Sequence, residues 1–245
     1  MALAPASAAG AGDSVNAVWR RLRGLPPRDP RQCRVLTWQS LRWVWRQRAF
    51  TPLHLVGYLR YAWLRLRRPD IVTEGFVFLG RRVQLECRPG YGRMILGRWV
   101  HVGDFTALRA HEGTLRVHDK VVLGCRDTVN CYLDIEIGAA TLVADDVYIG
   151  DFDHIATDPS RPIKDQGLVM SPIRIGAGSW LGTKTTVLRG SSLGPGSVLA
   201  AGAVLRGMHG PHRVLAGVPA RVVRDLSGLP DQAGAGEMRA IPTGE

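Results

Sequence analysis

The sequence predicts a mainly β chain, a solenoid of short parallel strands that follows an α-helical segment at the N-terminus. Two observations predict this class. In the second half of the 245 residues an aliphatic side chain returns every six positions, and the excess positive charge is confined to the first 70 residues. Those 70 residues hold 13 arginines and three acidic residues, which accounts for +10 of the net charge of +11. A boundary near Asp70 follows, because the two parts differ in kind.

Composition bounds the class of protein. Hydrophobic residues make up 45% of the chain and charged residues 22%, which is typical of a globular protein. No stretch approaches the roughly 18 apolar residues of a membrane helix. Residues 1–34 are expected to form a flexible, basic tail, because Met1–Gly12 lacks the basic and apolar regions of a signal peptide. The four cysteines form no C-x-x-C pair, so free thiols and a cytoplasmic location are expected.

Residues 35–70 are predicted to form a basic amphipathic helical segment. Thr51 followed by Pro52 is typical of an N-cap with proline at the first helical position, so helices are expected on both sides of this pair. Trp and Arg side chains on such helices suit peripheral contact with an anionic membrane through residues 35–68. The same aromatic residues could instead pack on the solenoid, and both interpretations stay open. Nucleic-acid binding is not expected, because no recognised motif accompanies the charge.

The solenoid is expected over residues 71–226, with a flexible tail at 227–245. Its aliphatic series is strictly periodic, and a small residue stands two positions before each of the last five members. The two series are Ile175, Leu181, Val187, Leu193, Leu199, Leu205 and Ser179, Thr185, Ser191, Ser197, Ala203. Side chains two positions apart on a strand point the same way, so both series should fill the interior. Gly or Ala directly after the aliphatic residue suits a bend, and three six-residue units close a triangular coil that stacks on its neighbours.

The period is interrupted once. An earlier run with the same spacing comprises Ile137, Val143, Ile149 and Ile155, but residues 156–172 contain three prolines and lack the repeat. This segment is expected to be a loop extruded from the prism. His154 precedes Ile155 and should therefore point outward at the start of the loop. Asp153 should point inward if the repeat continues that far.

Four segments in this order resemble the hexapeptide-repeat sugar O-acetyltransferase family: Val147–His154, Pro172–Gly176, Trp180–Gly182 and Ala216–Arg224. The family fold is a left-handed parallel β-helix, and the resemblance covers Leu79 to Leu226. It implies a homotrimer that transfers an acyl group, acetyl being the expected one, from an acyl-CoA to a hydroxyl of a sugar or glycoconjugate. Transfer would be direct, in a ternary complex, and no metal is expected.

The resemblance also implies site residues. His154 corresponds to the general base. Relatives carry a glutamate in the loop before the Pro-Ile segment, and because this chain has none there, Asp153, Asp165 and a backbone carbonyl are the candidates for orienting His154. Asn130 is the candidate for binding the acceptor. For coenzyme A, Gly182 and Ala200 would leave room for the pantetheine arm, and Arg206 and Arg221 would meet the phosphates.

Two alternatives stay open. Hexapeptide solenoids also serve as non-catalytic scaffolds, although the ordered motifs argue against that function here. A further β-helix family comprises zinc-dependent carbonic anhydrases, whose liganding pair has an H-x-x-x-x-H spacing. His101, His111, His118 and His154 show no such pair, so the zinc enzyme is the less favoured interpretation.

Overall fold

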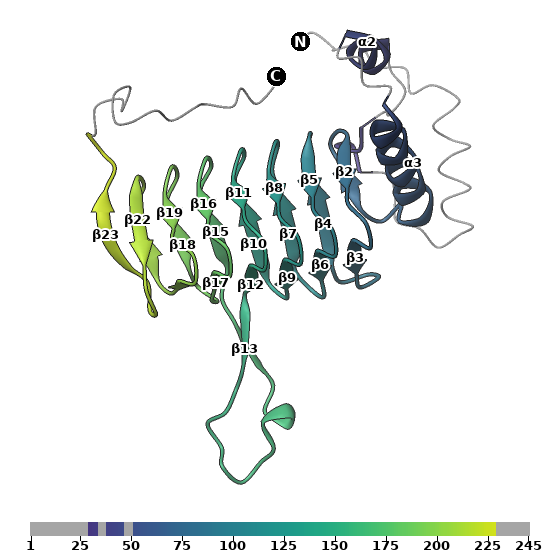
Figure 1. The fold of residues 1–245 in the computed structure, drawn as a ribbon. Helices are drawn as coiled ribbons and strands as arrows, with labels where there is room; N and C mark the ends of the chain where they lie inside the picture. Colours follow the sequence, from purple (N-terminus) through teal and green to yellow (C-terminus); the bar gives the residue numbers. More distant parts are fainter. Residues whose placement is uncertain (1–28, 34–37, 47–50, 229–245) are drawn as a thin grey trace, which may run out of the picture.

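The computed structural model describes residues 29–33, 38–46 and 51–228. It is a left-handed parallel β-helix with helices at its N-terminal end and a hairpin projecting from its middle (Figure 1). Three sheets form the faces of the prism, and the chain visits them in the same order in every coil. Face A comprises β1 (Val72–Thr73), β4 (Arg93–Leu96), β7 (Thr114–Val117), β10 (Asp134–Ile137), β15 (Ile173–Ile175), β18 (Ser192–Leu193) and β21 (Met208–His209).

The other two faces of the prism extend along the same β-helix axis. Face B comprises β2 (Val77–Leu79), β5 (Val100–Val102), β8 (Val122–Leu123), β11 (Leu142–Val143), β16 (Trp180–Leu181), β19 (Val198–Leu199), β22 (Arg213–Ala216) and β23 (Arg221–Asp225). Its last pair, β22 and β23, is antiparallel and closes the C-terminal end. Face C comprises β3 (Gln84–Cys87), β6 (Ala107–Ala110), β9 (Thr128–Cys131), β12 (Tyr148–Gly150), β17 (Thr186–Val187) and β20 (Val204–Leu205).

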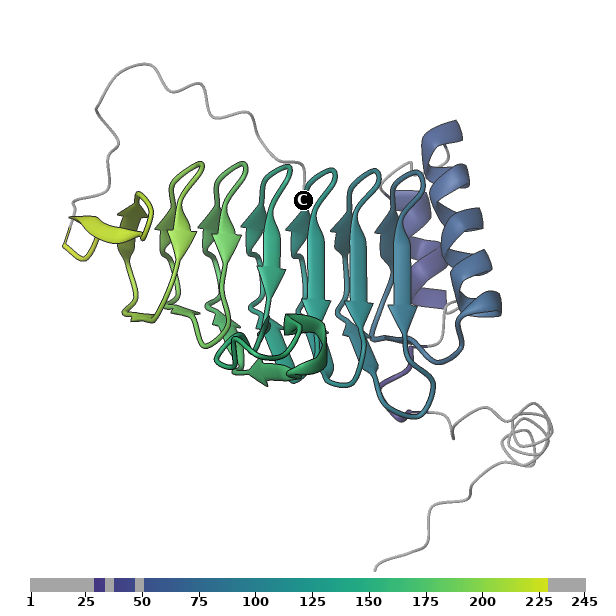
Figure 2. The ribbon, with the colours of Figure 1, turned by 90° about the horizontal axis from the view of Figure 1, so that it is seen from below.

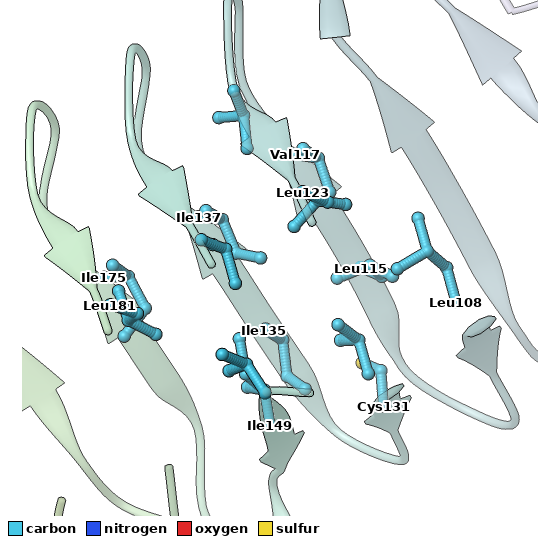
Figure 3. Close-up of a cluster of buried hydrophobic side chains, with 14 of the residues drawn as sticks. Leu108, Leu115, Val117, Leu123, Cys131, Ile135, Ile137, Ile149, Ile175 and Leu181 are labelled. Carbon is cyan, nitrogen blue, oxygen red and sulfur yellow. The ribbon is translucent and has the colours of Figure 1, made fainter. Parts of the chain in front are cut away.

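The interior of the prism is built as the period predicts. The six aliphatic residues from Ile175 to Leu205 are all buried, and so are the five small residues that stand two positions before them. Equivalent residues of successive coils lie directly opposite each other, as in the pairs Ile135–Ile173 and Ile137–Ile175. Figure 3 shows Ile135, Ile137 and Ile175 pointing into the prism. Both inward series of the sequence prediction are therefore confirmed.

The bends differ from the prediction in one respect. Glycine directly after the aliphatic residue is required by close stacking, because a Cβ at Gly176 would lie 2.3 Å from the backbone nitrogen of Pro195 in the next coil. The left-handed backbone conformation falls two positions later. There Gly178, Gly190, Gly196 and Gly202 have φ between 63° and 71°, and Lys184 takes the same conformation at 59°. The strained position of each corner is thus the third residue after the aliphatic one, not the first.

The predicted helices are present within the described residues. Helix α2 spans Trp38–Arg46 and α3 spans Pro52–Arg67, with Pro52 at its start and the Thr51 side chain accepting from the His54 N–H. Tyr61 and Leu64 of α3 are buried against the first coil. The Tyr61 hydroxyl lies 2.7 Å from the Gly75 carbonyl oxygen and 2.9 Å from Thr73 Oγ1. Helix α3 therefore caps the N-terminal end of the core.

Parts of the predicted tails lie outside the described residues, which exclude 1–28 and 229–245. Residues 29–33, assigned to the N-terminal tail above, lie against the first coil, where the Cys33 N–H donates to the Thr73 carbonyl at 2.9 Å. All four cysteines are free thiols.

The extruded segment is a β-hairpin. Strand β13 (Phe152–His154) pairs antiparallel with β14 (Leu168–Met170), and the connecting loop contains one short 3-10 helix, η1 (Ile163–Asp165). Seen from the side and from below, the hairpin leaves the prism where face C meets face A (Figures 1 and 2). The prediction that Ile155 joins the core is wrong. Ile173 takes that place beside Ile135, and Ile155 lies half-exposed in the hairpin, because the insertion begins before residue 155.

Candidate functional site

His154 is the last residue of β13, opposite Leu168, and its side chain is exposed. Its outward orientation was predicted, although it results from the hairpin and not from the six-residue repeat. Among the described residues, its one ring contact is Phe152, edge-on with centroids 6.2 Å apart, and none of them hydrogen-bonds its imidazole. Both ring nitrogens are therefore open to a substrate hydroxyl or to water.

A ladder of aromatic rings positions the base of the hairpin. Phe152 lies on Tyr132 with ring centroids 4.4 Å apart, and Tyr132 stacks on His111 at 4.5 Å. These residues belong to three successive coils at the same corner of the prism. Such contacts stabilise a fixed ring arrangement beyond the area they bury. The ladder therefore ties strand β13, and His154 with it, to the solenoid.

Neither of the two carboxylates predicted to orient His154 hydrogen-bonds its imidazole. Asp153 is exposed, because the repeat does not continue as far as this residue, and its Oδ2 accepts from Arg189 Nε at 2.6 Å. Asp165 lies on η1, where Oδ1 accepts from Lys164 at 2.7 Å. Both carboxylates are thus engaged by cations. Arg189 was not predicted, and its position just before the bend after β17 gave no signal of this contact.

Asp151, at the start of the hairpin, is fully buried and has a structural role. Its carboxylate accepts from the backbone N–H groups of Tyr132, Leu133 and Asp134, each at 2.8 Å. Three donors converging on one carboxylate hold the turn between β9 and β10 in the preceding coil. The hairpin therefore starts from a rigid corner.

Face C carries the predicted acceptor residue. Asn130 lies on β9 opposite Gly150 of β12, so it is one coil from the residue that precedes the hairpin. Its Oδ1 is buried and has no hydrogen-bond partner. Next to it, the hydroxyl of Tyr148 lies 2.4 Å from the point where a Cβ of Gly150 would be, so the phenol lies across the bare Gly150 backbone. Sequence reasoning did not single out Tyr148, which stands in the same Val147–His154 segment.

Three of the four predicted coenzyme A residues lie in one row. Gly182 donates its N–H to the Leu199 carbonyl, Ala200 donates to Leu215, and Ala216 at the end of β22 pairs with Arg221. These residues follow the face B strands at the corner between faces B and C. We call Gly182, Ala200, Ala216 and Arg221 the small-residue row. Close stacking of the coils also requires glycine at position 182, because a Cβ there would lie 2.6 Å from the Ala201 nitrogen.

Arg206 does not join this row. It follows β20 at the corner where face C meets face A, and its carbonyl lies 3.1 Å from His209 Nε2. Arg206 and Arg221 are both exposed. His154 and the small-residue row therefore lie on different edges of the same prism, with face C between them.

The residues 29–33, 38–46 and 51–228 offer neither of two other kinds of site. No group of three or more His, Cys, Asp or Glu side chains there is arranged to hold a metal ion. Neither described helix is long and apolar enough to cross a bilayer.

Comparison with known proteins gives close matches in sequence and in fold, while no protein-family model matches the chain. A Mycobacterium tuberculosis protein named "Probable acetyltransferase Rv3034c" is 50% identical over 206 residues, which cover 84% of this chain and 69% of the relative. The Escherichia coli protein named "Putative lipopolysaccharide biosynthesis O-acetyl transferase WbbJ" is 36% identical over 97 residues, covering 37% of this chain and half of the relative.

A solved structure shares the architecture. AntD, an N-acyltransferase from Bacillus cereus in complex with dTDP and 3-hydroxybutyryl-CoA, superposes with a TM-score of 0.58. The match covers 67% of this chain and 88% of AntD at 14% sequence identity, and it therefore shows a common fold.

Proposed function

Since the chain belongs to the hexapeptide-repeat sugar O-acetyltransferase family, we propose that it transfers an acyl group, acetyl by expectation, to a hydroxyl of a sugar or glycoconjugate. The chain is an acyltransferase, and acetyl-CoA or another acyl-CoA is its co-substrate. The non-catalytic scaffold is accordingly set aside. The observation that carries the proposal is the exposed His154 on a hairpin anchored to the prism, in a chain that is 50% identical over 206 residues to a protein named as a probable acetyltransferase.

The proposed mechanism uses His154 as general base. A neutral imidazole can accept a proton from an acceptor hydroxyl. The hydroxyl oxygen attacks the thioester carbonyl, and the tetrahedral oxyanion requires hydrogen-bond donors such as backbone N–H groups. When the intermediate collapses, the C–S bond breaks, and the imidazolium returns its proton to the departing CoA thiolate. Atoms and charges balance without a covalent enzyme intermediate.

The orientation of His154 is proposed to come from the strand that carries it. Asp153 and Asp165 remain the candidate carboxylates from sequence, and each is paired with a cation in the structure. The Asp153–Arg189 pair links β13 to the bend after β17, one coil further on. Together with the aromatic ladder, this pair would hold the histidine in position without a direct hydrogen bond.

The small-residue row is the proposed path of coenzyme A. It presents backbone and methyl groups along one edge and ends at the exposed Arg221 guanidinium, which suits a phosphate. Arg206 is a second candidate for phosphate at the neighbouring edge. For the acceptor, the unpartnered Oδ1 of Asn130 supports a hydrogen bond from a sugar hydroxyl, since a buried polar atom without a partner is unfavourable.

The proposed assembly is a homotrimer. The proposed base lies on one edge of the prism and the proposed path of coenzyme A on another, so the two are too far apart to act together within one copy. Each site would therefore combine His154 of one copy with the small-residue row of a neighbouring copy. Face B offers a contact surface. The side chains of Val122, Leu142 and Trp180 lie directly opposite one another on its outer side, and each is 38–48% exposed. Such an apolar row on a flat sheet favours burial against a second copy.

The test of the function is the His154→Ala variant. Turnover, measured as free CoA released from acetyl-CoA with a panel of sugar acceptors, should fall at least about 100-fold, the usual contribution of a general base. Acetyl-CoA binding, followed by thermal shift, should be kept. His118→Ala is the matched control, because His118 pairs with Glu136 away from the hairpin. Near wild-type turnover of His154→Ala would remove this residue from the mechanism, and an acylated Cys or Ser during turnover would refute direct transfer.

A further inference from the structure

Helix α3 has two apolar sides, one buried against the solenoid and one exposed in the described part of the structure. Tyr61 and Leu64 are buried against the first coil. On the opposite side Leu55, Leu59, Trp63 and Leu66 are 51%, 70%, 60% and 74% exposed, and Val56 beside them is also exposed. We call these five residues the α3 stripe. At 100° per residue the first four fall within an arc of about 80°, so they form one continuous strip along the helix.

The α3 stripe lies at the end of the molecule. Figures 1 and 2 show α3 covering the first coil at the end opposite β23, with α2 next to it. Because Tyr61 and Leu64 face the solenoid, the stripe faces away from it. Trp38 and Trp45 of α2 add two rings that are 81% and 76% exposed. Seven large apolar side chains are therefore exposed at one end, which is unusual for a protein surface without a partner.

The segment of the chain that carries the stripe is basic along its whole length. The sequence from residue 30 to residue 69 contains nine arginines and no acidic residue. Three of these arginines are held by the fold: Arg60 and Arg68 donate to the Leu79 and Leu85 carbonyls, and Arg65 donates to the Cys33 carbonyl. Arg42, Arg46 and Arg67 have exposed side chains next to the apolar residues. Arg67 lies over the Trp63 ring, 5.2 Å from its centroid.

We infer that this end of the molecule docks on an anionic lipid bilayer, with the α3 stripe inserted at the level of the headgroups. An amphipathic helix lies in the bilayer interface when Trp and Leu form one face and Arg flanks it, and anionic lipids strengthen the contact. The uninterrupted positive charge favours a lipid surface over a protein partner, since protein surfaces mix both signs of charge. The inference is independent of the acyl transfer reaction.

Vesicle sedimentation of the full chain tests this inference. Vesicles of phosphatidylcholine with phosphatidylglycerol are compared with pure phosphatidylcholine vesicles, at low and high salt. The full chain should bind the anionic vesicles, bind neutral ones at least about tenfold more weakly, and lose affinity as salt screens the arginines. The double variant Leu59→Gln, Leu66→Gln should weaken binding at least about tenfold. Both residues lie on the exposed side of α3, so the fold should be retained.

A matched control removes the same kind of surface elsewhere. Met208→Gln with Val223→Gln changes two exposed apolar residues at the opposite end of the solenoid, and this variant should bind vesicles like the unaltered chain. Three results would overturn the inference: no binding to anionic vesicles at low salt, equal binding to neutral vesicles, or equal loss in both double variants. If sedimentation velocity instead shows that the stripe variant alone loses an oligomeric state, the stripe contacts a second copy and the lipid inference is wrong.

Discussion

Asp127 gives the sharpest test of the energetics of the solenoid. It stands two positions before Val129, in the inward position that the coils from Ser179 onward fill with Ser, Thr or Ala, and its side chain is buried. Oδ1 accepts from the Val147 N–H at 2.8 Å, while Oδ2 is buried without a partner. Burial, with a smaller contribution from the nearby charge of Asp145, raises the pKa of this carboxyl from 3.8 to about 7. The folded protein therefore holds a proton there that the unfolded chain releases.

The sign of the pH dependence follows from this difference. Below pH 3.8 Asp127 is protonated in both states and its contribution to stability is fully present. As the pH rises towards 7 the unfolded chain loses the proton first, so the free energy of unfolding decreases, and above pH 7 the full cost applies. A pKa change from 3.8 to about 7 corresponds to on the order of 4 kcal/mol. Asp127→Asn cannot ionise and keeps an oxygen acceptor for the Val147 N–H.

We therefore expect Asp127→Asn to be more stable than the unaltered protein at pH 8, by up to about 4 kcal/mol, with a much smaller difference at pH 5. Urea unfolding at both values, at one fixed protein concentration, measures this. Asp158→Asn is the control, because Asp158 is an exposed-loop residue whose pKa is lowered by Ser160. If Asp127→Asn is no more stable than the unaltered protein at pH 8, the carboxylate is not the desolvated charge described above.

Four further outcomes are expected. Asp151→Ala should lower the free energy of unfolding by at least about 3 kcal/mol in urea titrations, because three backbone N–H groups lose their acceptor; a loss below about 1 kcal/mol would contradict this role. Tyr61→Phe should cost about 1–3 kcal/mol by the same measurement, and no change would mean that its buried hydroxyl is dispensable. Arg189→Ala should change stability by less than about 1 kcal/mol but lower kcat, and an unchanged kcat would exclude a positioning role. Trp180→Glu should convert the proposed trimer to monomers in sedimentation velocity and abolish activity, and a fully active monomer would refute the proposed shared site.

The fold could be predicted from the sequence because its rule is local. Each coil repeats the same inward pair of side chains, as at Ser179 and Leu181, so six residues contain the information for one side of the prism. The helix boundary at Thr51 and Pro52 was equally local, since cap and proline are adjacent. The left-handed sense of the β-helix is not encoded in such a local pattern. It was predicted from the resemblance to a known family.

The site was less predictable because its contacts join distant parts of the chain. Asp153 contacts Arg189 of the next coil, and Phe152 contacts the ring of Tyr132 in the previous one. No spacing along the chain encodes such pairs before the register of the inserted hairpin is known. The wrong assignment of Ile155 has the same origin. A six-residue period cannot reveal whether its last member belongs to the core or to the insertion.

The place of the hairpin explains how the repeat accepts an insertion without loss of its core. Strand β15 resumes directly beside β10, so Ile173 fills the position beside Ile135 whatever the length of the loop, and loop closure becomes only slowly less favourable with length. Asp151 fixes the base of the hairpin through two sets of hydrogen bonds. Its carbonyl accepts from the Ser171 N–H at 2.9 Å, and its carboxylate accepts from the N–H groups of the turn between β9 and β10. The position of His154, three residues further on, is therefore set by the coil before it.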